Sequence, residues 1–168
     1  SGDFNWGIFA GLVVVDIIFM ALNTGEMPRL HRANWDFTLS AFEAAVMEET
    51  LFRFAILGIL FYAWRNVKQR LPLALATSSI LFGIVHLTNY GPQEWSMTVL
   101  QAVSAAGIGL FFATVYVYTG QLWLAMVMHF LLDWTAFIAS DSTLMTGKVT
   151  VQNWIGTGIE LVVFIGIA

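Results

Sequence analysis

Six long apolar stretches, separated by short polar segments, constrain this chain more than any other feature of its sequence. A helix needs about 20 apolar residues to cross a bilayer, and lipid admits only helices and closed barrels, because backbone polar groups must be satisfied internally. These runs are too long and too continuously apolar for barrel strands. We therefore expect an all-α, polytopic transmembrane helical bundle of about six spans. The stretches are Trp6–Leu22, Phe37–Ala63, Leu71–Thr88, Trp95–Tyr118, Gln121–Ile138 and Asn153–Ala168.

The composition agrees with a chain surrounded by lipid. Of its 168 residues, 58% are hydrophobic and only 11% are charged, whereas soluble domains carry about 25% charged residues. The absence of cysteine excludes disulfides, thiolate metal sites and cysteine nucleophiles. The sequence has no basic patch of the kind that binds nucleic acid. We expect a single integral membrane domain over residues 1–168, with membrane lipid as its first partner.

The sequence leaves the ends and the orientation of the chain open. The first stretch begins almost at once, without the basic segment of a secretory signal, and the last is apolar to the final residue. We therefore expect either a fragment or disordered ends. The positive-inside rule gives no orientation, because both sides carry the same number of basic residues. One side has Arg65, Lys68 and Arg70, and the other has Arg29, Arg32 and Lys148.

Pairs of small residues spaced by four predict where helices pack closely. Such pairs let two backbones approach each other in a membrane. We assign them packing and no chemistry. The pairs are Ala102 with Ala106, Ala105 with Gly109, and Gly7 with Gly11.

Charged residues in the second stretch are the most informative departure from the apolar pattern. Each ionised group at mid-bilayer costs about 2.5–3.5 kcal/mol on insertion scales, so these side chains must pair or face water. Arg53 follows Glu49 by four residues, which places both on one helix face as a pair. Glu48 is rotated away from Arg53 and is free to point into a cavity. Glu43 lies near the start of the stretch and suits a structural or interfacial role.

Other polar residues in the spans allow two interpretations. His86 ends the third stretch, one turn after Phe82, and His129 precedes Asp133 by four residues on the fifth. A lone histidine in an apolar helix is usually a satisfied core residue. Together with Glu48, however, these groups favour a shared polar cavity. We expect it to open toward the side of loops 26–36, 89–95 and 140–152, called side A below. His31 falls in a polar loop, and structural roles suit the isolated Asp16 and Glu160.

Three motifs carry a resemblance to a known family: Glu48-Glu49-x-x-x-Arg53, Phe82-x-x-x-His86 and His129-x-x-x-Asp133. Their order and spacing resemble the CPBP family, which contains the type II CAAX prenyl endopeptidases and the bacterial Abi proteins. The resemblance covers about residues 37–138 and implies a four-helix catalytic core with flanking helices. It also implies an integral protein of the bacterial inner membrane. The expected substrate is a peptide or a prenylated, membrane-associated protein.

The resemblance implies a glutamate-dependent intramembrane endopeptidase. On the family pattern, Glu48 and His86 bind and activate a water that attacks a peptide carbonyl. Glu49 and Arg53 hold the local structure, with Phe82 in support. His129 and Asp133 stabilise the oxyanion, although an ionised Asp133 would repel it, where the prenyl-protein enzymes commonly have Asn. Asp133 is therefore either protonated or orients His129 by accepting its ring N–H.

Cofactor use and two other functions stay open at this point. We expect no cofactor, and the alternative is a zinc ion held by Glu48, His86 and His129. A non-catalytic scaffold, assembly or immunity subunit on the same fold, within a larger membrane complex, is the alternative function. A proton or ion pathway through Asp16, Glu43, Glu48 and His86 is a third hypothesis, but the inverted repeats of many transporters are absent from the sequence.

Overall fold

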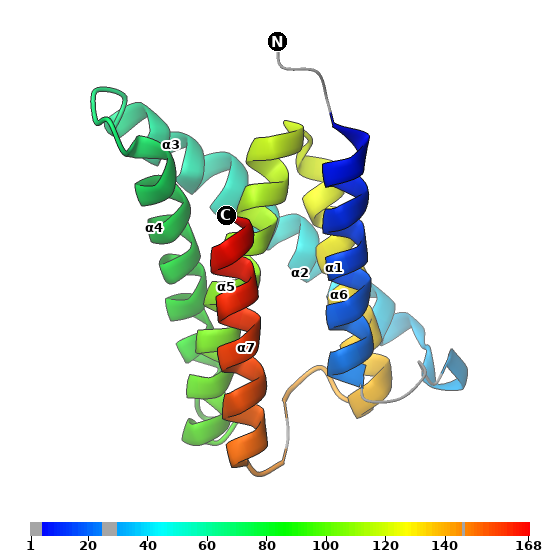
Figure 1. Cartoon of the computed structure of the whole chain (residues 1–168). Helices are drawn as coiled ribbons and strands as arrows, with labels where there is room; N and C mark the ends of the chain where they lie inside the picture. The colour runs from blue at the N-terminus through cyan, green and yellow to red at the C-terminus, as the bar shows by residue number, and fades with distance from the viewer. Residues whose placement is uncertain (1–4, 25–29, 146) are drawn as a thin grey trace.

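The computed structural model describes residues 5–24, 30–145 and 147–168 of the chain, which form a helical bundle (Figure 1). Two short 3-10 helices and one π-helix interrupt the α-helices; they are η1 (Leu30–Arg32), η3 (His86–Asn89) and the π-helix η2 (Thr50–Ile56). The α-helices are α1 (Trp6–Thr24), α2 (Trp35–Glu49), α3 (Leu57–Ala63), α4 (Arg70–Val85), α5 (Trp95–Thr119), α6 (Leu122–Ser140) and α7 (Val151–Ile167).

The all-α prediction is confirmed, and every expected span is helical to within two residues of its predicted ends. The described part of the chain contains no strand. Local signals explain several of these ends. Asn34 caps α2 by accepting a hydrogen bond from the backbone N–H of Phe37. Gly120 ends α5 in the left-handed conformation, with φ 67°, which a residue without Cβ adopts at little cost.

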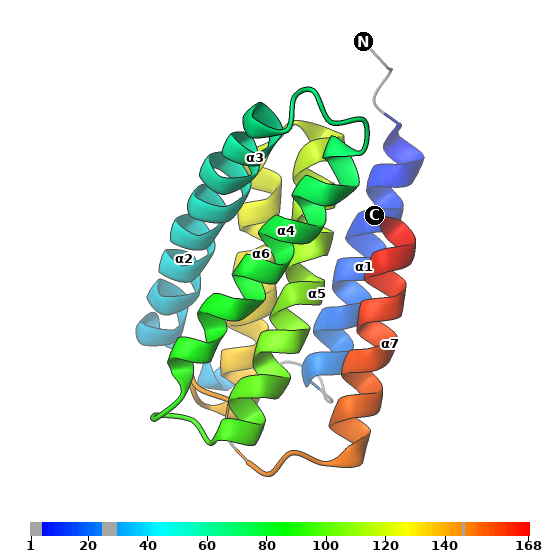
Figure 2. The same cartoon turned by 90° about the vertical axis from the view of Figure 1, so that its left-hand side faces the viewer.

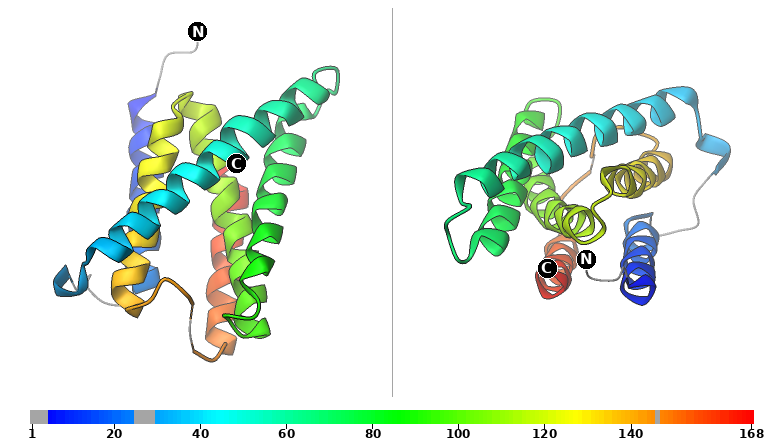
Figure 3. Two further views of the ribbon diagram at one scale, coloured as in Figure 1. Left: turned by 180° about the vertical axis from the view of Figure 1, so that it is seen from behind. Right: turned by 90° about the horizontal axis from the view of Figure 1, so that it is seen from above.

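The second expected span is one continuous helix built from α2, η2 and α3, and it crosses the bundle on a slant (Figure 3). Its first half packs on α6 and its second half on α4. Figure 2 shows this helix on the opposite side of the bundle from α1 and α7. The π-helical turn lies in the middle, directly after Glu49, and π-helical turns are frequent at functional sites.

The main apolar core lies between α5, α6 and the two flanking helices α1 and α7. Phe19 of α1 and Phe164 of α7 meet there, with ring centroids 4.6 Å apart. This core leaves the other side of α6 free to face α2 and η2, where the polar residues gather. The buried core residues are Leu12, Phe111, Phe112, Val115, Ala125, Met128, Leu132 and Phe164.

Close packing at small residues occurs between α4 and α5 but not at the start of α1. A Cβ added to Gly83 would lie only 2.5 Å from the Ala102 carbonyl oxygen and 2.8 Å from the Ala106 Cβ. The prediction for α5 is therefore confirmed at this pair. The prediction for Gly7 and Gly11 is wrong, because Gly11 has open space around it and Gly7 meets only the neighbouring Asn5 side chain.

Three helical segments within the described residues are long and apolar enough to cross a membrane: Arg70–Asn89, Trp95–Thr119 and Leu122–Ser140. Two shorter apolar helices, Trp6–Ala21 and Val151–Ile167, flank them. Figure 1 shows η1 and the loops before α5 and before α7 at one end of the bundle, which is side A. Arg29, counted among the basic residues of side A, lies outside the described residues.

Candidate active site

Glu48 and Glu49 are consecutive residues at the end of α2, yet their surroundings differ. Successive residues on an α-helix point about 100° apart, so only one of the two can face directly into the bundle. Glu49 does so, and its side chain is 0% exposed. The side chain of Glu48 is 30% exposed. The structure thus places one carboxylate in the protein interior and the other at its edge.

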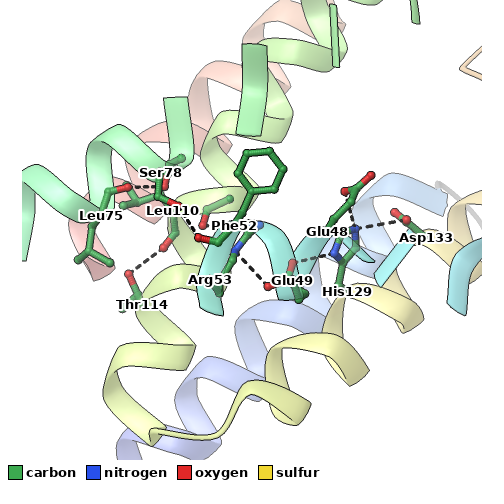
Figure 4. A network of polar contacts seen from close by, with 12 residues as sticks. Glu48, Glu49, Phe52, Arg53, Leu75, Ser78, Leu110, Thr114, His129 and Asp133 are labelled. Atoms are coloured by element: carbon green, nitrogen blue, oxygen red, sulfur yellow. Dashed lines mark hydrogen bonds and ion pairs between the residues drawn. The ribbon is translucent and has the colours of Figure 1, made fainter. Parts of the chain in front are cut away.

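Glu49 is held from two directions (Figure 4). Its Oε2 lies 3.0 Å from Arg53 Nε, which confirms the predicted pair. Its Oε1 accepts a hydrogen bond of 2.8 Å from Nδ1 of His129 on α6, a contact that the spacing within one helix could not reveal. Buried charges are tolerated only when they are well paired. Through these two contacts, Glu49 links η2 to α6.

Arg53 is 1% exposed and links the network to two further helices. Its Nη2 donates a hydrogen bond of 3.2 Å to the carbonyl oxygen of Gly109 on α5. Its guanidinium lies over the ring of Phe82 on α4, with its Cζ 4.3 Å from the ring centroid. Stacking over an aromatic face suits a guanidinium, which is more weakly hydrated than an ammonium. Arg53 therefore joins η2, α4 and α5 at a single point.

Phe82 lies between the two histidines of the candidate site. Its ring centroid is 4.8 Å from that of His86 and 6.0 Å from that of His129, and both contacts are edge-to-face. Phe52 packs against the same ring at 5.0 Å. Phe82 thus packs against both imidazoles, and the supporting role predicted for it stays a prediction.

His86 stands where α4 gives way to the 3-10 helix η3, and its side chain is half-buried. Its Nδ1 lies 2.8 Å from the carbonyl oxygen of Phe82. Because a carbonyl only accepts, Nδ1 carries the hydrogen, and Nε2 of the neutral ring keeps its lone pair. His86 also lies within electrostatic range of Glu48. The imidazole can therefore accept a hydrogen bond close to a carboxylate.

His129 connects the buried carboxylate to the two that are partly exposed. Its Nε2 lies 3.3 Å from Asp133 Oδ2 and 3.8 Å from Glu48 Oε2. The Asp133 side chain is 26% exposed, and the ring of Phe112 stacks on the imidazole at 5.1 Å. Figure 4 shows Glu48 and Asp133 beside one edge of the ring and Glu49 beside the other. The imidazole orientation is thus set from both sides.

The structure therefore brings together three of the four residues predicted to be catalytic, Glu48, His129 and Asp133, and places His86 on the other side of the Phe82 ring from His129. Their roles stay predictions. Glu43 does not join them, because its side chain is exposed on α2, and His31 is exposed on η1. Glu48, Asp133 and His86 are each partly exposed, and the expected cavity between them stays a prediction.

Asp16 lies nearer the site than the isolated structural role expected for it, as only the ion-pathway hypothesis had implied. It is 5% exposed on α1, which packs against α6, and it lies within electrostatic range of His129. The sequence feature that could have pointed to Asp16 was a charged residue inside an apolar span. Glu160 has the structural contact that we expected, because its Oε2 accepts a hydrogen bond of 2.8 Å from Ser104 Oγ.

The donor set gives no support to the zinc alternative. Across residues 5–24, 30–145 and 147–168, no three His, Asp or Glu side chains are grouped so that they could hold a metal ion. Nδ1 of His129 is already engaged by Glu49, and that of His86 by the Phe82 carbonyl. We derive no step through a metal, and the expectation of no cofactor stays a prediction.

The arrangement of carboxylates and imidazoles within a helical membrane bundle defines a class: integral membrane proteins with a polar site enclosed by their helices. The model of the Rce1-like family, "Type II CAAX prenyl endopeptidase Rce1-like", matches residues 31–135. This match spans more than half of the chain and includes all seven predicted site residues. The protein belongs to this family, whose members are in general proteases. Neither a curated protein nor a solved structure matches the chain.

Proposed function

We propose that this protein is an active intramembrane endopeptidase that cleaves a prenylated, membrane-associated protein substrate. The observation that carries the proposal is the meeting of Glu48, His129 and Asp133 at the edge of a buried ion pair. The family match supports the reaction class. The non-catalytic scaffold is not favoured, and no contact of the exposed Glu43 supports the ion pathway.

In the proposed mechanism, Glu48 is the general base. It takes a proton from a water molecule that also donates a hydrogen bond to Nε2 of His86, and the water oxygen attacks the scissile carbonyl carbon. A positioned general base contributes about 100- to 10,000-fold to such a reaction. The C–N bond then breaks, and the proton held by Glu48 passes to the leaving amine.

His129 is proposed to stabilise the oxyanion that develops on the scissile carbonyl. The Nδ1 contact to Glu49 holds the ring, so Nε2 is aimed at the space between Glu48 and Asp133. Asp133 accepts from Nε2 in the resting site and gives way when the substrate oxygen arrives. An oxyanion donor of this kind is worth about 3–4 kcal/mol, because it is already oriented when the charge appears.

The proposal is tested with purified protein in lipid nanodiscs and an S-farnesylated peptide that ends in a CAAX sequence. We expect the wild type to release the terminal tripeptide, and His86→Ala to lower kcat by at least about 100-fold while the protein stays folded. His31→Ala is the matched control, because this histidine is exposed on η1. Equal cleavage by the two variants would contradict the role of His86, and an inactive wild type would refute the proposal.

Metal dependence and location are tested separately. We expect cleavage to survive a strong chelator, because the proposed mechanism routes no step through a metal. Loss of cleavage that added zinc restores would overturn this expectation. Residence in a bacterial inner membrane rests on the family resemblance alone and stays a prediction, which fractionation of the native host would check.

A further inference from the structure

Three side-chain amides form a hydrogen-bonded cluster that begins at Asn89, one turn of η3 after His86. Oε1 of Gln101 on α5 accepts from Nδ2 of Asn89 at 2.9 Å and from Nε2 of Gln93 at 2.9 Å. Residues i and i+3 of a 3-10 helix eclipse each other, so Asn89 lies on the same face of η3 as His86. The cluster therefore continues the candidate active site toward side A.

The hydrogen bonds within the cluster determine which amide atoms stay available. Both lone pairs of Gln101 Oε1 are engaged, which orients all three amides. Gln101 Nε2 is left as a donor, and Asn89 Oδ1 and Gln93 Oε1 are left as acceptors. Gln93 is only 4% exposed, and its Oε1 is buried with no hydrogen-bond partner among the described residues. A buried acceptor of this kind destabilises the free protein unless something binds to it.

The loop that carries Gln93 is held in a fixed shape. The Gln93 N–H donates to the Asn89 carbonyl at 3.1 Å, and the Gly91 N–H donates to the Gln93 carbonyl at 3.3 Å. Gly91 has φ 112°, a conformation that favours glycine. Residues 90–96 line a shallow hollow at side A, and Tyr90 and Trp95 pack edge-to-face at its rim, with ring centroids 5.4 Å apart. Gln93 is thus one of the residues that line a preformed hollow, although its unpaired Oε1 is itself buried.

We propose that Asn89, Gln93 and Gln101 form a subsite that binds the main chain of the peptide substrate. A peptide group offers one N–H donor and one carbonyl acceptor, which complement the free acceptor of Gln93 and the free donor of Gln101. A chain that approaches His86 from side A passes this cluster first. Main-chain recognition makes the subsite indifferent to the substrate's side chains. This inference rests on the proposed endopeptidase function.

Gln101→Glu tests the role of the free donor, Nε2 of Gln101. A carboxylate keeps an acceptor for Asn89 and Gln93, so the internal hydrogen bonds survive, but the free N–H is lost. The test measures binding of the fluorescein-labelled, S-farnesylated CAAX peptide to the full chain in nanodiscs, in a Glu48→Gln background that prevents turnover. We expect Kd to rise about tenfold, the equivalent of one hydrogen bond. Gln69→Glu, the same change at an exposed position on the opposite face, is expected to leave Kd unchanged.

Gln93→Met separates a binding role from a structural one. It removes a buried acceptor that is unpaired in the free protein, and with it the Nε2 hydrogen bond to Gln101. These two changes act on stability in opposite directions, so we expect an unfolding temperature close to that of the parent and a Kd about tenfold higher. Peptides with a single ester in place of one amide locate the contact. One ester position is expected to weaken binding to the parent protein but not to Gln93→Met, because both changes remove the same hydrogen bond.

Binding is measured in the Glu48→Gln background, and cleavage is measured separately in the wild type. A peptide that binds but is not cleaved by the wild type would refute the proposed function and leave the subsite standing. The subsite is overturned if no form of the protein binds the peptide. It is also overturned if Gln101→Glu and Gln93→Met bind as tightly as Gln69→Glu, or if every ester weakens binding equally in the parent and in Gln93→Met. Should Gln101→Glu not fold, Gln93→Met and the ester series decide the question.

Discussion

Glu49 and Glu48 are neighbours in the chain but belong to two different halves of the same polar cluster. The buried half consists of Glu49 and Arg53, whose charged groups contact each other, His129 and the Gly109 carbonyl. The open half consists of Glu48, His86 and Asp133, which are partly exposed and more loosely held. His129 and Phe82 contact both halves.

This difference teaches how a membrane protein can keep reactive groups in an apolar setting. Charges in the bilayer interior are destabilising unless they are paired, and the ion pair of the buried half, with its contacts to His129, Phe82 and Gly109, links four helical segments. The open half keeps polar atoms available for water and substrate. We infer that the buried half determines the fold and that the open half performs the chemistry, and each prediction below tests this division.

The largest effect on stability is expected for Arg53→Met. The substitution leaves Glu49 buried without its cation, and breaking one partner of a buried pair costs about 3–5 kcal/mol. Heating in detergent followed by size-exclusion chromatography measures the fraction that stays monodisperse. Arg65→Met is the matched control, because Arg65 is exposed and its guanidinium contacts the ring and the carbonyl of the nearby Tyr62. Equal stability of the two variants would contradict the account of the buried half.

A smaller but clear loss of stability is expected for Gly83→Ala. The new Cβ would meet the Ala102 carbonyl at 2.5 Å, so α4 must move away from α5. Overpacking of this kind typically costs about 1–3 kcal/mol. Gly58→Ala in α3 is the control, because nothing lies within 4 Å of its added Cβ. If both variants melt at the wild-type temperature, the close approach of α4 and α5 is wrong.

Phe82→Leu should lower both activity and stability, because Phe82 contacts both halves. An apolar replacement keeps most of the buried volume, so we expect a loss of less than about 1.5 kcal/mol. It removes the ring that packs against both imidazoles, and we expect kcat to fall about tenfold, or about 1.4 kcal/mol in the barrier. Steady-state cleavage and thermal unfolding on the same preparation separate the two effects. A stable variant with wild-type kcat would show that the ring is dispensable.

The smallest effect is expected for Glu43→Gln. This carboxylate shares α2 with Glu48 but is exposed and outside the cluster. Both cleavage and unfolding temperature are expected to stay at their wild-type values. A marked loss of cleavage would revive the ion pathway through Glu43 and weaken the distinction between the two halves.

The sequence predicted the local features of this structure better than the distant ones. Helix ends follow from apolar runs that stop at polar residues, glycine or caps such as Asn34, and the Glu49–Arg53 pair follows from helical periodicity within one segment. The contact between Glu49 and His129 joins residues far apart in the chain, so no spacing rule could supply it. The π-helical turn was also missed, because it has no residue signature of its own.

The most direct test of the account compares Glu48→Gln with Glu49→Gln, each measured for thermal unfolding and for peptide cleavage per folded molecule. We predict that Glu48→Gln unfolds at the wild-type temperature and cleaves at least about 100-fold more slowly, whereas Glu49→Gln loses much of its stability because Arg53 is left unpaired. Wild-type cleavage by Glu48→Gln, or equal destabilisation of the two variants, would contradict the division between a buried half that folds and an open half that reacts.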